Sequence, residues 1–261
     1  MSKPIPWLTL FAVVLSVVVG LYLWRAGETP APQITRPKTA SPPKEPAIRY
    51  PIEAAGPAQE ADAPLPALAD SDKAMQDALA KLFGRNLAEF FNLQDIIHRV
   101  VATVDNLPLG HLPAQLLPVK SVPGWLITTG KDEDLSLSPK NAARYQPYVR
   151  VAKSVPIAPL VAVYIRFYPL FQEQYEKLGY PDKYFNDRLV QVIDHLLATP
   201  EVKGPVLLTQ TTVLYQFADP ELEKLSAGQK ILVRMGGENA ALVKAKLTEI
   251  RSALVASPPK G

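Results

Sequence analysis

The sequence contains no cysteine, and only three of its 261 residues are histidine. Without cysteine, the chain can form no disulfide, no thiolate nucleophile and no cysteine-ligated metal site. The histidines, His98, His111 and His195, lack the HExxH or related spacing that makes a metal site specific. We therefore expect neither a metal nor a cofactor.

The chain also lacks a strong excess of one charge, since 28 lysines and arginines stand against 25 aspartates and glutamates. Proteins that bind nucleic acid usually carry a basic patch, so nucleic acid is not an expected partner. A GxSxG elbow, a phosphate-binding loop and a dinucleotide fingerprint are absent as well. Serine hydrolases and nucleotide-binding proteins therefore have no support from a local motif.

One long uncharged stretch is present near the N-terminus. Residues 4–24 carry no charge and match the roughly 20 residues that a helix needs to cross a bilayer. Trp7, Tyr22 and Trp24 lie near its ends, where aromatic rings favour the membrane interface. A cleaved signal peptide is the alternative, but the long apolar run and its bulky C-terminal end favour an uncleaved helix. We assign residues 1–25 to a transmembrane anchor.

The charges beside this anchor leave two orientations open. Lys3 precedes the helix, whereas several basic residues follow it, so a positive-inside count places the C-terminal part in the cytoplasm. Long C-terminal regions, however, can cross the membrane largely regardless of charge. A short lysine-bearing tail before one apolar helix is the usual form of an N-inside anchor. We expect a single-pass inner-membrane protein with a periplasmic C-terminal domain, and a cytoplasmic domain is the alternative.

Proline is abundant, with 27 residues in the chain, and many of them follow the anchor. Residues 26–69 are rich in proline, and Tyr50 is their single aromatic residue. Such a composition cannot bury enough apolar surface to fold, so it predicts a disordered linker of polyproline II character. A ligand for a partner domain, at "SPPKEP", is the alternative interpretation.

Residues 70–257 have the pattern of a compact, mainly α multi-helix domain, and residues 258–261 form a flexible tail. Capping residues, helical periodicity and terminating glycines predict helices. These cover residues 70–84, 87–107, 138–154, 157–179, 181–198, a segment after Asp219, and two segments separated by Gly236 and Gly237. Short alternating runs at 125–128 and 135–137 predict a hairpin, and those at 206–208 and 213–217 predict two more strands.

The helix at 181–198 carries the main candidates for a functional site. At 100° per residue its apolar side chains share one broad face, and polar side chains share the other. The catalytic candidates are Asp187, Asp194 and His195, and the binding candidates are Tyr184, Arg188 and Gln191. Two carboxylates in line could divide acid and base roles. We favour the more common arrangement, a polar face packed against another element through hydrogen bonds and ion pairs.

Asn186 differs from these side chains, because it lies inside the apolar face of the same helix. An unpaired buried amide is costly, so we expect Asn186 to bond to backbone at the nearby helix junction.

Four long runs of the domain resemble a known family. They are "RVVATVDNLP", "YPLFQEQYEKLGYPDKYFNDRLVQVIDHLLATPEVKGPV", "FADPELEKLSAGQKILVRMG" and "ENAALVKAKL". In this order they resemble the proteobacterial domain-of-unknown-function family 3014. The resemblance implies a membrane-anchored, proline-linked helical domain in a Gram-negative envelope. It implies no activity and no functional residues.

Two functions follow as hypotheses. The first is a membrane-anchored envelope protein, without catalysis, whose helical domain binds another envelope protein or a cell-wall component. The alternative is a hydrolase of cell-wall material that uses Asp187, Asp194 and His195. The two differ in whether the polar face of helix 181–198 opens into a pocket or is covered and paired.

Overall fold

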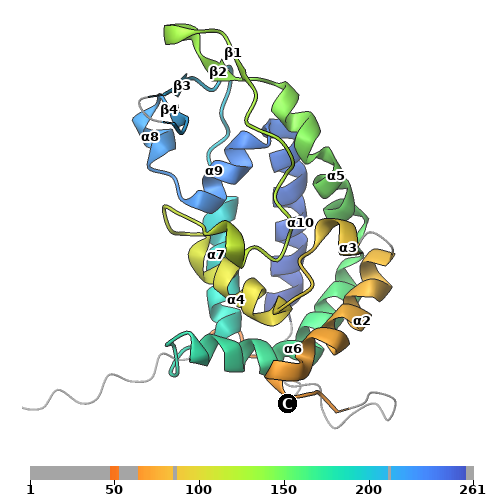
Figure 1. Ribbon diagram of the computed structural model, residues 1–261. Helices are drawn as coiled ribbons and strands as arrows, with labels where there is room; N and C mark the ends of the chain where they lie inside the picture. Colours follow the sequence, from red (N-terminus) through yellow and green to blue (C-terminus); the bar gives the residue numbers. More distant parts are fainter. Residues whose placement is uncertain (1–47, 53–63, 85–86, 211–212, 257–261) are drawn as a thin grey trace, which may run out of the picture. The chain divides into compact units, whose positions relative to one another are not determined.

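The computed structural model describes residues 48–52, 64–84, 87–210 and 213–256. Within these residues the protein is mainly helical, with nine α-helices and small antiparallel strand pairs (Figure 1). The helices are α2 (Ser71–Phe83), α3 (Leu87–Phe90), α4 (Ile96–Asn106), α5 (Lys140–Ser154), α6 (Ile157–Lys177), α7 (Phe185–Leu197), α8 (Pro220–Glu223), α9 (Ala227–Arg234) and α10 (Gly237–Val255). The predicted membrane anchor lies outside the described residues.

Most of the sequence-based helix predictions are confirmed, although some ends differ. The single helix predicted at 87–107 is wrong, because α3 ends at Phe90 and α4 begins at Ile96. Asp95 has φ +51°, and the Asp72 carboxylate of α2 accepts from the N–H groups of Asp95 and Ile96, which starts a new helix there.

α7 begins at Phe185 instead of at residue 181 or 182, because residues 180–183 form a turn that the Lys183 N–H closes onto the Tyr180 carbonyl at 3.2 Å. The predicted break between the last two helices falls at Gly236, where φ is +85°. A Cβ at this position would lie 3.2 Å from the Cβ of Ala142 on α5, so the close packing also favours glycine.

The main hydrophobic core lies around α6, which packs against α2, α4, α7 and α10. Its central side chains include Phe167 and Phe171, which are almost fully buried together with Phe185 of α7. The rings of Phe171 and Phe185 stack with centroids 5.9 Å apart. This aromatic contact fixes the first turn of α7 on α6, and the first turn carries several of the predicted site residues.

α10 forms a second packing centre, because it lies against both α5 and α7 (Figure 1). Leu254 of α10, Val190 and Ile193 of α7, and Val161 of α6 form a buried apolar cluster. α7 is therefore buried on its apolar side by α6 and α10, as its pattern of apolar residues predicts.

The four strands are each two residues long and form two antiparallel pairs. β1 (Thr128–Thr129) pairs with β2 (Ser136–Leu137), and β3 (Leu208–Thr209) pairs with β4 (Gln216–Phe217). The predicted strand at 125–128 overlaps β1 only at Thr128. The reason is that the Asn141 side chain of α5 binds both the N–H and the carbonyl of Ile127.

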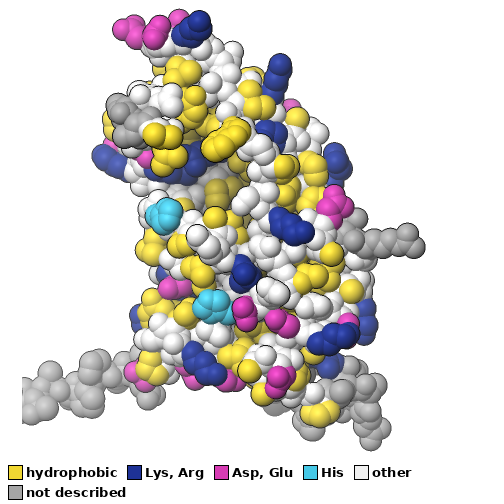
Figure 2. All heavy atoms as spheres, viewed as in Figure 1, with side chains coloured by type: hydrophobic (Ala, Val, Ile, Leu, Met, Phe, Trp, Pro, Cys, Tyr) yellow, Lys and Arg dark blue, Asp and Glu magenta, His cyan; other side chains and the backbone are white. Residues whose placement is uncertain are grey.

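No single helix among the described residues is long and apolar enough to cross a membrane. The pair α5 and α6 meets the criterion together, by length and composition only, and is bent by 81°. Figure 2 shows acidic and basic side chains interspersed over one face, with hydrophobic side chains between them.

Residues 48–52 lie against α7, and we call this segment the strap. Ile52 is only 7% exposed, and Leu65 and Leu68, further along the predicted linker, also pack on the core. At these positions the structure differs from the free spacer that the proline content predicts. The difference arises because a few apolar side chains between the prolines pack into the surface of the domain.

Candidate functional site

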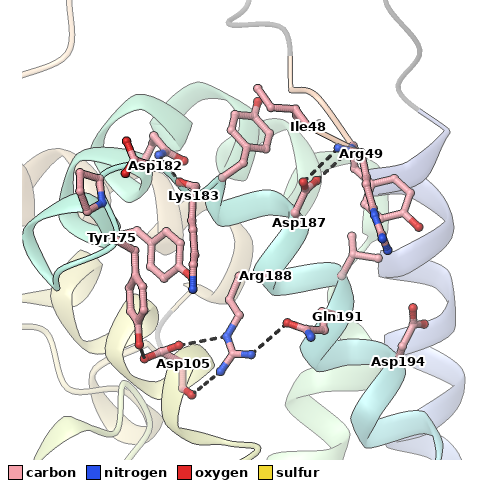
Figure 3. A pocket seen from close by; sticks show the side chains of 16 residues that line it. Ile48, Arg49, Asp105, Tyr175, Asp182, Lys183, Asp187, Arg188, Gln191 and Asp194 are labelled. Carbon is pink, nitrogen blue, oxygen red and sulfur yellow. Dashed lines mark hydrogen bonds and ion pairs between the residues drawn. The ribbon is translucent and has the colours of Figure 1, made fainter. Parts of the chain in front are cut away.

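A groove of about 730 Å³ lies over the polar side of α7 (Figure 3). The strap, the end of α4, the end of α6 and the turn at 180–184 form its other walls. Five of the six predicted site residues line this groove. They are Tyr184, Asp187, Arg188, Gln191 and Asp194.

Asp187 binds the strap through its backbone (Figure 3). One carboxylate oxygen accepts a hydrogen bond from the Arg49 N–H at 3.0 Å, and the other accepts one from the Tyr50 N–H at 2.8 Å. A carboxylate makes such bonds stronger than a neutral acceptor would. Asp187 also lies in the first turn of α7, where the helix dipole favours a negative charge.

Tyr184 and Asn186 bind the rest of the strap backbone. The Tyr184 hydroxyl accepts from the Ile52 N–H at 2.6 Å and donates to the Ile52 carbonyl at 3.1 Å. Asn186 Nδ2 donates to the Tyr50 carbonyl at 2.8 Å. Pro51, which lies between Tyr50 and Ile52, has no N–H that would need a partner. Three neighbouring side chains at the start of α7 therefore hold the strap, which bends at Arg49 and Tyr50, by its main chain.

Two strap side chains add apolar contacts. Ile52 is buried in the main core, and Tyr50 packs against the cluster that α6, α7 and α10 share. Ile48, by contrast, is 54% exposed. Tyr50 and Ile52 therefore anchor the strap to the domain, while its N-terminal end lies at the surface.

The other side of the groove is an ion-pair network between α4 and α7. Arg188 Nε donates to Asp105 Oδ1 at 3.0 Å, and Arg188 Nη2 donates to the Asp105 carbonyl at 2.8 Å. Arg188 Nη1 donates to Gln191 Oε1 at 3.0 Å, and the Tyr180 hydroxyl donates to Asp105 Oδ2 at 3.0 Å. The arginine and the aspartate are mostly buried, so this network holds the wall of the groove firmly in place.

The phenols of the site are held in their protonated form. The hydrogen bond to Asp105 and the charge of this carboxylate raise the pKa of Tyr180. Burial raises the pKa of Tyr175 to about 12, to which the Asp105 charge adds while Arg188 opposes it. Burial also raises the pKa of Tyr164 well above its ordinary value. Each of these hydroxyls therefore remains a hydrogen-bond donor at neutral pH.

Asp194 and His195 have partners away from the strap. Both oxygens of Asp194 accept hydrogen bonds from Arg251 of α10, one of them at 3.1 Å. His195 does not line the groove, and its Nε2 lies 2.9 Å from the hydroxyl of Ser226, which caps α9. Asp187 and Asp194 are two helical turns apart, about 10 Å along the axis. The structure thus places the three catalytic candidates against three different partners.

The partner of Asn186 differs from the predicted one. Asn186 is fully buried and does bond to backbone, but this backbone belongs to Tyr50 and not to the helix junction. Sequence reasoning also missed Asp105 and Tyr180 as parts of the site. One signal pointed to the strap: Tyr50 is the single aromatic residue of the proline-rich stretch and is followed by Pro51 and the apolar Ile52.

Other features of the described residues are separate from this groove. An almost wholly apolar cavity of about 330 Å³ lies among Phe83, Phe90 and Tyr148, and a third of about 630 Å³ adjoins the start of α10. Neither is lined by a predicted site residue. Over the part of the chain that the structure describes, no group of three or more aspartate, glutamate or histidine side chains could hold a metal ion.

The fold and the groove define a helical domain that binds a segment of its own chain by its main chain. A family model described as "Protein of unknown function (DUF3014)" matches residues 96–251, more than half of the chain. The chain belongs to this family, which confirms the resemblance seen in the sequence. The match spans α4 to α10 and so includes both walls of the groove, whereas the strap lies outside it. No curated protein and no solved structure matches the chain.

Proposed function

We propose that this is a membrane-anchored binding protein of the cell envelope, whose helical domain holds another envelope protein in the groove beside α7 without catalysing a reaction. One observation carries the proposal. Asp187, Asn186 and Tyr184 bind the main chain of a polypeptide segment that bends at Arg49 and Tyr50. Recognition of this kind is typical of domains that take up a segment of a partner.

The polar face of α7 has the properties of a binding surface. Its carboxylates and its arginine are each engaged in a hydrogen bond or an ion pair. A hydrolase that used Asp187, Asp194 and His195 would need these groups around one substrate atom. The groove over α7 is a feature that a hydrolase would also need. The three candidate groups, however, contact three different parts of the chain, so the binding function has the stronger support.

The location of the protein rests on its sequence. The uncharged run at residues 4–24 supports an inner-membrane anchor, and the form of the short N-terminal tail supports a periplasmic domain. A groove on an anchored domain would hold its partner near the membrane surface.

Site-specific photocrosslinking tests the proposal in the intact, membrane-inserted chain. A photoreactive residue replaces Gln191, which lines the groove and is exposed. A matched chain carries the same residue at Lys153, which is exposed at the end of α5 and does not line the groove. We expect one discrete crosslinked envelope protein from position 191 and none from position 153. An absence of product at 191, or the same products at both positions, would contradict the proposal.

A further inference from the structure

We propose that the groove recognises a peptide segment with an aromatic–proline–aliphatic sequence, and that the strap is an intramolecular ligand that the partner's segment replaces. This inference rests on the proposed function, because it specifies the chemistry of the partner at the same groove. The strap has the sequence "IRYPI" and occupies the groove, so we infer the sequence preference of the groove from it.

The hydrogen bonds of the strap would be available to another chain. Asp187, Asn186 and Tyr184 make five of them, and every one involves a backbone N–H or carbonyl of the strap. No bond in this set depends on a strap side chain. A segment of a second protein that adopts the bend of Arg49 and Tyr50 presents the same N–H and carbonyl groups.

The sequence preference comes from three successive positions. An aromatic ring at the position of Tyr50 packs on the cluster of Val161, Val190 and Ile193. An aliphatic side chain at the position of Ile52 enters the main core. Between them, proline brings no N–H that would need an acceptor. Proline also restricts the backbone before binding, which lowers the entropy lost when the segment docks.

The strap is a small ligand that a competitor can displace. Its contacts include two apolar side chains, five main-chain hydrogen bonds and an interaction of the Tyr50 hydroxyl with Arg251 of α10. Ile48 and Arg49 at its N-terminal end are exposed. Its advantage over a free peptide is its attachment to the domain, which gives it a high effective concentration. A partner that brings additional contacts to the rest of the groove can exceed this advantage.

A peptide-binding measurement tests the inference on the full chain in detergent. The probe is a fluorescein-labelled peptide PAIRYPIEA, the sequence of residues 46–54. The receptor is a double variant, Tyr50→Ser with Ile52→Ser, in which the strap has lost both apolar contacts. We expect fluorescence anisotropy to show binding at least about tenfold tighter than to the unmodified chain, where the attached strap competes.

Two controls separate docking in the groove from nonspecific binding. A peptide methylated on the backbone nitrogen of its tyrosine keeps every side chain but lacks the N–H that Asp187 accepts. Asp187→Asn, added to the double variant, replaces one carboxylate oxygen with an NH2 group. This group is a donor and faces a backbone N–H of the peptide, which is also a donor. Each change is expected to weaken binding by about tenfold or more. Equal binding with either change would overturn the inference.

Hydrogen exchange on the unmodified chain provides a test that needs no variant. An excess of the unlabelled peptide is expected to raise the exchange rate of the Arg49 and Tyr50 amides several-fold, while the interior amides of α7 stay protected. Unchanged exchange at Arg49 and Tyr50, or failure of the peptide to bind a folded double variant, would overturn the inference. The crosslinking result at Gln191 is independent of these measurements, so the two proposals fail separately.

Discussion

Asn186 joins three parts of the chain at one buried point. Its Oδ1 accepts a hydrogen bond from the Tyr164 hydroxyl of α6 at 3.1 Å, and its Nδ2 donates to the carbonyl of Tyr50 in the strap. Its own N–H donates to the Tyr168 hydroxyl at 3.3 Å. Because Asn186 is fully buried, each of these groups would be costly to leave without a partner. The amide therefore couples the strap to the core.

Replacement of this amide is the first test at the residue scale. We expect Asn186→Ala to lower the free energy of unfolding by about 2 kcal/mol, because the buried Tyr164 hydroxyl loses its acceptor. Gln191→Ala, on the exposed side of the same helix, is the matched control and should change it by less than about 0.5 kcal/mol. Urea denaturation with an unchanged m-value measures both. Equal effects of the two substitutions would show that the Asn186 amide has no special role.

The sequence predicted the faces of α7 but not the partners of its residues. Periodicity separates Val192 and Ile193 from Asp187 and Asp194, because that separation depends only on the helix itself. The bond from Asn186 to Tyr50 joins residues 136 positions apart, and no local pattern encodes such a contact. The same holds for the Asp105–Arg188 ion pair, whose members are 83 positions apart.

At the scale of the element, the end of α7 and the start of α9 are joined by one polar cluster. The Ser226 hydroxyl accepts from the Gln229 N–H at 3.2 Å, and the Gln229 side chain accepts from the Ser226 N–H at 3.3 Å, which forms a capping box. Gln229 Nε2 also donates to the His195 carbonyl at 3.1 Å. His195, a catalytic candidate in the sequence, thus contributes to the connection between two helices.

Removal of this cap tests that connection. Ser226→Ala should lower the free energy of unfolding by about 1 to 2 kcal/mol, since α9 loses its cap and His195 loses a buried hydroxyl partner. Asp219 caps α8 by accepting from the Glu221 N–H at 2.8 Å, but the site is exposed and the helix is one turn long. Asp219→Ala should therefore cost less than about 0.5 kcal/mol. Thermal and urea melts of both variants measure the difference, and equal losses would contradict it.

The elements themselves were largely predictable, and their ends were less so. Asp219 followed by Pro220, and Gly236 before Gly237, are local signals whose physical basis lies within a few residues. The start of α7 was predicted too early, because the turn at 180–183 is stabilised by stacking of Tyr180 on Tyr175 of α6, with centroids 4.7 Å apart. Such a contact depends on the tertiary fold.

At the scale of the whole molecule, the proposed binding site is supported by the structure, and the proposed membrane anchor is supported by the sequence. The described residues supply the groove and the strap, whereas the membrane anchor is predicted from residues 4–24. Composition alone predicted a spacer over residues 26–69. It could not show that a segment with two apolar side chains finds complementary sites on the domain.

Reporter fusions test the membrane orientation. If the domain has the proposed periplasmic location, a C-terminal alkaline phosphatase fusion of the full chain will be active and a matching GFP fusion will be dark. Deletion of residues 4–24 is the control and should abolish phosphatase activity, since the passenger then stays in the cytoplasm. An inactive phosphatase beside a fluorescent GFP would place the domain in the cytoplasm and contradict the proposed location.

The docking of the strap also determines the length of the tether. With residue 48 fixed on α7, the chain between the predicted anchor and the surface of the domain is residues 26–47, which can span about 70 Å at most at 3.1 Å per residue. Without the strap, the next described residues packed on the core are Leu65 and Leu68, and the stretch 26–63 before them could span about 120 Å. A partner segment that took the place of the strap would therefore lengthen the tether between the anchor and the domain. Occupancy of the groove would then set how far from the membrane the domain can reach.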